Sequence, residues 1–127
     1  MIIGIGTDIV EVERIKSSLT RTSERFAQRI LSDNEYEQFK KNNFPERFLA
    51  KKFAAKEAFA KALGTGFRNG LNMCDIEITH TELGQPIITY IGESESIKEL
   101  LSTNSSCHIT ISDEKNYAVA FVIIEQQ

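Results

Sequence analysis

The residues with the clearest chemical potential lie in an alanine-rich stretch, Glu46 to Leu63, which is predicted to be a long helix. Glu57 and Lys61 are one turn apart there, on a side where alanines would let a ligand or another backbone come close. Burying such charges without partners costs on the order of several kcal/mol, so something must neutralise them. A simple ion pair between the two, worth about 0.3–0.5 kcal/mol, is one interpretation, and a ligand site is the other.

The opposite side of this helix is broadly apolar but carries two lysines, Lys52 and Lys56. The structural interpretation is that both side chains extend along the surface and reach water. The apolar residues on that side are Phe48, Leu49, Phe53, Phe59 and Leu63.

Asp8 is the other acidic candidate, because it stands where an apolar strand, Met1 to Thr7, gives way to a helical spacing that begins at Ile9. Its position supports two interpretations about equally. Asp8 could cap the first helix, with Glu11 three residues later, or it could be a ligand.

A row of arginines follows at offsets of seven, four and four residues, which on continuous or collinear helix aligns them in one stripe. The stripe is basic within a protein of net charge −3, a charge that argues against nonspecific nucleic-acid binding by the whole surface. Such stripes are more often solvated faces than docking sites. The stripe consists of Arg14, Arg21, Arg25 and Arg29.

Two weaker signals have ordinary structural interpretations. Gly64-Thr65-Gly66 suits a helix stop, and it lacks the lysine and the length of a phosphate-binding P-loop. His108 falls in a predicted strand, where a histidine is more often structural than catalytic.

The hydrophobic pattern predicts one α+β domain over residues 1–127, with a small, mainly antiparallel sheet packed against the long helix. Ser32 and Glu35 have capping-box spacing and should start a helix that ends before Phe44-Pro45. Further strands are expected at 75–79, 87–91, 108–112 and 118–124, with a short helix at 95–101 and a loop at 102–106. The last strand is apolar throughout, which suits cover on both faces.

The chain contains no long apolar run and no secretory leader pattern, so we expect a cytoplasmic protein that does not enter membranes. Cys74 and Cys107 are not spaced as a C-x-x-C pair, and reduced core thiols are expected.

Taken together, three ordered segments closely resemble the holo-acyl-carrier-protein synthase family: Gly4 to Glu11, Arg47 to Ala58, and Lys61 to Gly66. The resemblance extends to Arg68-Asn69-Gly70-Leu71, to the turn Leu83-Gly84-Gln85-Pro86 and to the hairpin from His108 to Glu125. It implies transfer of 4′-phosphopantetheine from coenzyme A to a serine of apo acyl carrier protein, with release of adenosine 3′,5′-bisphosphate, in support of fatty acid biosynthesis.

The resemblance also implies that Asp8 and Glu57 bind Mg²⁺ and that Lys61 acts beside them in catalysis. Two carboxylates suit this ion, which is usually held by one or two carboxylates together with waters and substrate phosphates. The residues implied to contact coenzyme A are Arg47, Lys56, Lys61, Gly64, Thr65, Gly66, His108 and Thr110.

For the acidic carrier protein, the stripe residues Arg14, Arg21 and Arg25 are the expected docking site. The resemblance further implies a homotrimer with active sites between subunits, where His108 and Thr110 would serve the adjacent protomer.

Two other functions use the same residues. A non-catalytic module could hold coenzyme A or a nucleotide, and a Mg²⁺-dependent phosphohydrolase could use the two acids to activate water.

Overall fold

The computed structural model describes residues 1–68, 70–102 and 104–127. Asn69 of the Arg68 to Leu71 motif and Thr103 of the predicted 102–106 loop lie outside the described residues. The elements are β1 (Ile2–Glu11), α1 (Val12–Thr22), α2 (Glu24–Ile30), α3 (Asp33–Lys41), α4 (Pro45–Leu63), a 3₁₀ helix η1 (Met73–Asp75), β2 (Ile76–His80), β3 (Pro86–Tyr90), α5 (Glu95–Leu100), β4 (Ser105–Asp113) and β5 (Tyr117–Gln126).

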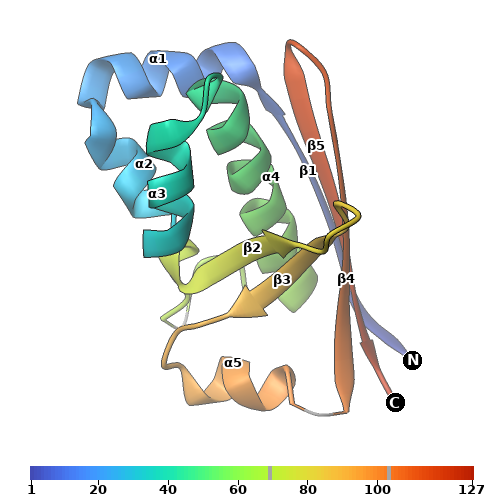
Figure 1. Ribbon diagram of the computed structural model, residues 1–127. Coiled ribbons are helices and arrows are strands. Elements are labelled where there is room, and N and C mark those ends of the chain that lie inside the picture. Colours follow the sequence, from blue (N-terminus) through green and yellow to red (C-terminus); the bar gives the residue numbers. More distant parts are fainter. Residues whose placement is uncertain (69, 103) are drawn as a thin grey trace.

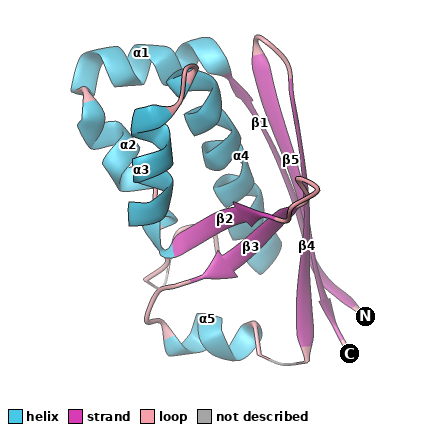
Figure 2. Ribbon diagram, in the orientation of Figure 1, coloured by secondary structure: helices cyan, strands magenta, loops and turns pink. Residues whose placement is uncertain are grey.

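Helix α4 lies between the other early helices and a three-stranded antiparallel sheet with the order β1-β5-β4 (Figure 1). Strands β2 and β3 form a separate two-stranded antiparallel sheet. Figure 2 shows β1, β5 and β4 gathered along one side of the molecule and helices α1 to α4 on the other. The predicted α+β class, with an antiparallel sheet on one long helix, is confirmed.

The core surrounds α4, with buried residues of the sheet on one side and of α1, α2, α3 and β2 on the other. The middle strand of the sheet is β5. Its inward residues Ala118, Ala120, Val122 and Ile124 are fully buried. Its outward residues Tyr117 and Phe121 remain exposed in the single chain, so the prediction of cover on both faces holds here for one face only.

The packing of α4 on β1 depends on two glycines. A Cβ atom added to Gly4 would lie 1.8 Å from the carbonyl oxygen of Ala62, and one added to Gly6 would lie 2.0 Å from that of Ala58. No real side chain tolerates such distances, so only glycine lets the helix lie directly on the strand backbone.

Strand β1 is longer than predicted, because the helical spacing that seemed to begin at Ile9 is still strand. Residues Asp8 to Glu11 pair with Ala120 to Tyr117 of β5. This ladder satisfies backbone groups that a helix would otherwise use, so α1 begins only at Val12. Glu11 is its N-cap residue, which eliminates the interpretation of Asp8 as the cap.

The arginine stripe is not continuous. Ser23 interrupts the helix with a positive φ of 57°, so Arg14 and Arg21 belong to α1 while Arg25 and Arg29 belong to α2. The expectation of one aligned row across four arginines is therefore wrong.

The local signals at helix ends are confirmed. Ser32 and Glu35 form the complete capping box of α3, Pro45 is the first residue of α4, and Gly64 ends α4 in the left-handed conformation at φ 84°.

The two lysines on the apolar side of α4 do not reach water, which corrects the predicted extension along the surface. The Lys56 ammonium donates to Glu35 Oε1 and to the carbonyl of Ile30, both at 2.6 Å. The Lys52 ammonium donates to the carbonyl of Ile78 at 3.3 Å and lies over the Phe48 ring. Acceptors from distant segments thus make burial of both charges tolerable.

Cys74 and Cys107 are free and half-buried, and burial raises the pKa of Cys107 to about 12. Over the described ranges, with residues 69 and 103 left out, the helices are all too short or too polar to cross a membrane.

Replacement of Lys52 should change the pH dependence of stability. Burial lowers the pKa of Lys52 from 10.5 to about 8, so between these pH values the unfolded chain binds more protons and stability rises with pH. Lys52→Met should therefore stabilise the protein at pH 7, by up to about 3 kcal/mol, and the gain should shrink toward pH 10. Urea unfolding at each pH measures this, and a gain that does not vary with pH would contradict it.

Candidate active site

Asp8 and Glu57 reach the same cleft, which has a volume of about 660 Å³. Asp8 lies on the side of β1 that the two glycines bring against α4, and Glu57 belongs to α4 itself. The Lys61 ammonium lies 3.4 Å from Asp8 Oδ1 and donates to the carbonyl of Thr7 at 2.9 Å. The three residues expected to be catalytic therefore meet at one place, and Lys61 pairs with Asp8 instead of Glu57.

Both carboxyl groups have raised pKa values. For Asp8, burial is the larger cause, and the hydrogen bond and charge of Lys61 oppose it. For Glu57, burial is again the larger cause, the negative charge of Asp8 adds to it, and Lys61 opposes it. One lysine thus compensates two carboxylates incompletely, so the cleft favours a further positive charge.

The donor set suits a hard divalent cation. In the described ranges, residues 69 and 103 excluded, no group of three or more histidine, cysteine or acidic side chains is placed to hold a metal ion. A pair of carboxylates leaves most of an octahedral shell to water or substrate oxygens, which is the arrangement that Mg²⁺ commonly adopts.

The walls of the cleft come from β1, α1, α2 and α4. Arg14 and Arg21 line it, as do Phe26 and Phe53, whose ring centroids are 6.4 Å apart. Arg25 is exposed on α2 but does not line the cleft. Sequence reasoning missed Phe26 and treated Phe53 as core, because a half-buried aromatic residue has the same spacing as a core residue.

The turn Gly64-Thr65-Gly66 follows Lys61 at the C-terminal end of α4. Its glycine N–H groups already donate within the protein, that of Gly64 to Lys61 and that of Gly66 to Ala60. Glycine is required at both positions, with φ 84° and 62°. The turn therefore closes the helix, and it borders Lys61 without offering these two N–H groups to a phosphate.

Lys56 cannot border a nucleotide as expected, because its side chain is fully buried and paired with Glu35. Its neighbour Glu57 faces the cleft, since successive helical residues point about 100° apart. The adjacent residues Lys56 and Glu57 therefore place a positive charge in the core and a negative charge in the cleft.

Three other expected ligand residues lie away from this cleft. His108 and Thr110 are exposed on β4, where His108 Nε2 lies 3.2 Å from Glu125 Oε1 and Thr110 is opposite Phe121. Arg47 donates to Asp113 at 3.2 Å.

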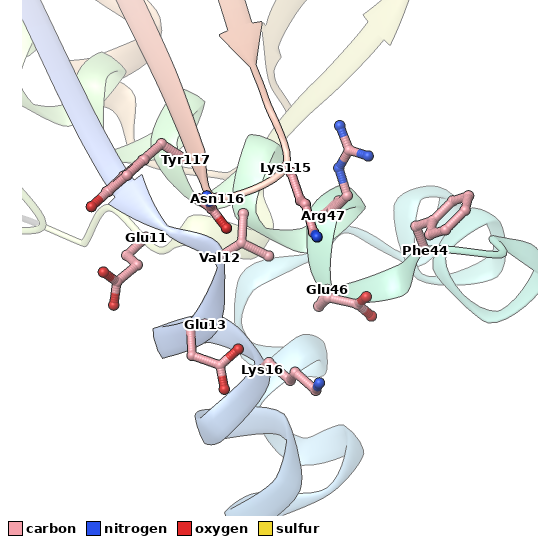
Figure 3. Close-up of a pocket in the computed structure, with 10 residues that line it drawn as sticks. All are labelled: Glu11, Val12, Glu13, Lys16, Phe44, Glu46, Arg47, Lys115, Asn116 and Tyr117. Carbon is pink, nitrogen blue, oxygen red and sulfur yellow. The ribbon is translucent and has the colours of Figure 1, made fainter.

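Arg47 also lines a second cleft of about 660 Å³, with residues from the β1–α1 junction, the start of α4 and the β4–β5 turn (Figure 3). Lys115 and Lys16 add positive charge there, while Glu11 and Glu13 add negative charge and line both clefts. In a single chain, the residues expected to contact coenzyme A therefore lie at separate places: beside Asp8, on β4 and in the second cleft.

The model of the 4′-phosphopantetheinyl transferase superfamily matches residues 4–122. The chain belongs to this superfamily. It is also 48% identical over 127 residues to a holo-[acyl-carrier-protein] synthase of Vibrio cholerae, with all of both chains covered.

Solved structures of such synthases are similar as well. The structure from Neisseria meningitidis has a TM-score of 0.89 and 43% identity, covering 99% of this chain and 100% of that one. The structure from Bacillus anthracis, in complex with coenzyme A (3′,5′-ADP), has a TM-score of 0.82 and 37% identity, covering 100% of this chain and 99% of that one.

Neutralising Glu57 should stabilise the fold. Burial raises its pKa, so the folded state disfavours the ionised carboxylate relative to the unfolded chain, and Glu57→Gln should raise the melting temperature at pH 7 by roughly 2–5 °C in buffer free of divalent cations. The gain should vanish in acid, where the glutamate is protonated in both states. Glu37→Gln, which removes an exposed partner of Lys40, is the control and should give no gain. A lower melting temperature for Glu57→Gln would contradict the electrostatics described above.

Proposed function

We propose that this protein transfers 4′-phosphopantetheine from coenzyme A to a serine of apo acyl carrier protein and releases adenosine 3′,5′-bisphosphate. The observation that carries the proposal is that Asp8 and Glu57 line one cleft, with Lys61 paired to Asp8, in a chain similar over its whole length to holo-acyl-carrier-protein synthases. We further propose that the reaction takes place in the cytoplasm and supplies carrier protein for fatty acid biosynthesis.

We propose Mg²⁺ as the cofactor, held by the carboxylates of Asp8 and Glu57. Their incompletely compensated charge supports a cation at this position. When bound, Mg²⁺ would offset negative charge on the coenzyme A pyrophosphate. Lys61 has three N–H donors and directs two of them at Thr7 and Asp8, which leaves one and supports a role in binding a phosphate oxygen.

In the proposed reaction the carrier serine hydroxyl attacks the β-phosphorus of coenzyme A, and the bond from that phosphorus to the adenosine bisphosphate oxygen breaks. The serine proton needs an acceptor. We propose a carboxylate of the Asp8 and Glu57 pair for this role, because both side chains face the cleft.

We propose that Arg14, Arg21 and Arg25 bind the acidic carrier protein. Arg14 and Arg21 line the cleft that holds Asp8 and Glu57, and Arg25 is exposed on the adjoining helix. Complementary charge would speed encounter and orient the serine toward the carboxylates. The apolar wall beside the arginines would exclude water from the docked segment.

We also propose a homotrimer with active sites between subunits. The outer face of the β1-β5-β4 sheet exposes an apolar row that continues across paired strands, with Ile5 and Ile9 61% and 64% exposed and Phe121 38% exposed. A second copy of the chain is the occupant that also explains why His108 and Thr110 share this face, since they would then reach the neighbour's coenzyme A. Arg47, in the second cleft, would do the same.

Intact-protein mass spectrometry tests the proposed function directly. Apo acyl carrier protein incubated with this protein, coenzyme A and Mg²⁺ should gain the mass of one phosphopantetheine, and a chelator should abolish the gain. Glu57→Gln should reduce the rate by about a hundredfold or more because it removes an anionic ligand. Coenzyme A binding without transfer would indicate the binding module, and coenzyme A cleavage without a carrier adduct would indicate the phosphohydrolase.

Charge reversal should separate carrier docking from coenzyme A binding. Arg14→Glu with Arg21→Glu should raise the KM for carrier protein at least about tenfold and leave the KM for coenzyme A nearly unchanged, because only the carrier depends on that surface for encounter. Lys98→Glu, on the exposed surface of α5, is the control. Equal changes in both KM values would refute the docking site.

Assembly can be tested on the outer sheet face. The unmodified protein should sediment as about three protomers at micromolar concentration. Phe121→Glu should yield monomers that fold but do not transfer, because a charge replaces an apolar residue in the proposed interface. An active monomer would eliminate the shared site.

A further inference from the structure

Lys56 and Glu35 form a buried ion pair on the side of α4 that faces α2 and α3. Both side chains are essentially inaccessible, at 0% and 1% exposed, and their charged atoms are 2.6 Å apart. The pair is separate from the Asp8 and Glu57 cleft, although Lys56 directly precedes Glu57 in the chain. None of the catalytic roles proposed above uses it.

This pair joins four segments of the chain. The Lys56 ammonium also donates to the carbonyl of Ile30, the last residue of α2. Glu35 Oε1 accepts the N–H of Ser32 at 2.9 Å, and Glu35 Oε2 accepts the N–H of Ile78 at 2.8 Å. Helix α4 is thereby connected to the end of α2, the start of α3 and strand β2.

The connection lies one turn away from the wall of the cleft. On α2, Ile30 follows Phe26 by four residues, and on α4, Lys56 follows Phe53 by three, so each pair shares one face of its helix. Phe26 and Phe53 contact each other at the cleft. Helices α2 and α4 are therefore joined twice, once by aromatic rings at the cleft and once by the ammonium.

The two connections between α2 and α4, the Phe26–Phe53 contact and the Lys56 hydrogen bonds, differ in their physical character. The two rings are tilted with centroids 6.4 Å apart, whereas the ammonium lies at a hydrogen-bond distance of 2.6 Å from both a carbonyl and a carboxylate oxygen. A buried ion pair is weak evidence for stability, since apolar pairs of similar volume are often as stable, and its directionality can instead specify position. The placement of α2 on α4 is what this pair can specify.

We propose that Lys56 and Glu35 are positioning residues for carrier protein docking, which hold α2 in one place on α4. Phe26 and Arg25, both on α2, thereby keep their positions relative to Asp8 and Glu57. This inference rests on the proposed transferase function and adds to it two residues that touch neither substrate.

The double variant Lys56→Met with Glu35→Gln tests this role. It removes both charges together, so no unpaired charge stays buried, and the glutamine carbonyl can still accept an N–H. The variant should fold and transfer phosphopantetheine, with the KM for apo carrier protein raised about tenfold and the KM for coenzyme A within about twofold of that of the unmodified protein.

Two further variants keep the test decisive. Val122→Ala weakens the core on the sheet side of α4 and should lower the melting temperature without changing either KM, as a purely structural loss would. Glu35→Asp keeps the charge but shortens the side chain by one methylene, and it should raise the KM for carrier protein by a smaller factor. If the double variant does not fold, Glu35→Asp decides the question.

All measurements use the full chain, well below each melting temperature, in the mass assay described above. An unchanged KM for carrier protein in the folded variants, or equal changes in both KM values, would overturn the positioning role while the transferase stands. Absence of transfer by the unmodified protein would instead overturn the proposed function, and the positioning role with it.

Discussion

The site depends on the contact between the backbone of β1 and helix α4. Gly4 and Gly6 have no side chain to hold the helix away, and the carbonyl groups of Ala58 and Ala62 occupy the space that a Cβ would need. The next inward residue of β1 is Asp8, which meets Lys61 of the same helix. A larger residue at either glycine would move β1 away from α4 and separate the carboxylates of Asp8 and Glu57. The two glycines therefore determine the geometry of the site as well as the packing.

The charged side chains on and beside helix α4 differ in how they are paired. Lys56 is buried with Glu35 and a carbonyl as partners, although burial still lowers the pKa of Lys56. Asp8 and Glu57 share one lysine between them, and both hold raised pKa values. The fold therefore gives one buried charge its own counter-charge and leaves two adjoining carboxylates to share a single lysine.

The single chain also leaves its surface incomplete. The outer face of the sheet is apolar, and the residues expected to contact coenzyme A divide between the surroundings of Lys61 beside Asp8, this face and a second cleft. Subunit assembly would cover the apolar face and bring the separated groups together in one step. The proposed trimer is therefore tied to the proposed activity, because the same surface serves both.

The sequence by itself determined the features that depend on neighbouring residues: the capping box at Ser32 and Glu35, the start and end of α4, the α+β class and the motifs that indicate the family. Only the tertiary structure decided that Asp8 lies in a strand, that Ser23 breaks the arginine row and that Lys56 is buried. The reason is that these features depend on contacts between residues that are far apart in the sequence. Asp8 pairs with Ala120 and Lys56 with Glu35, and no local pattern reports partners so far along the chain.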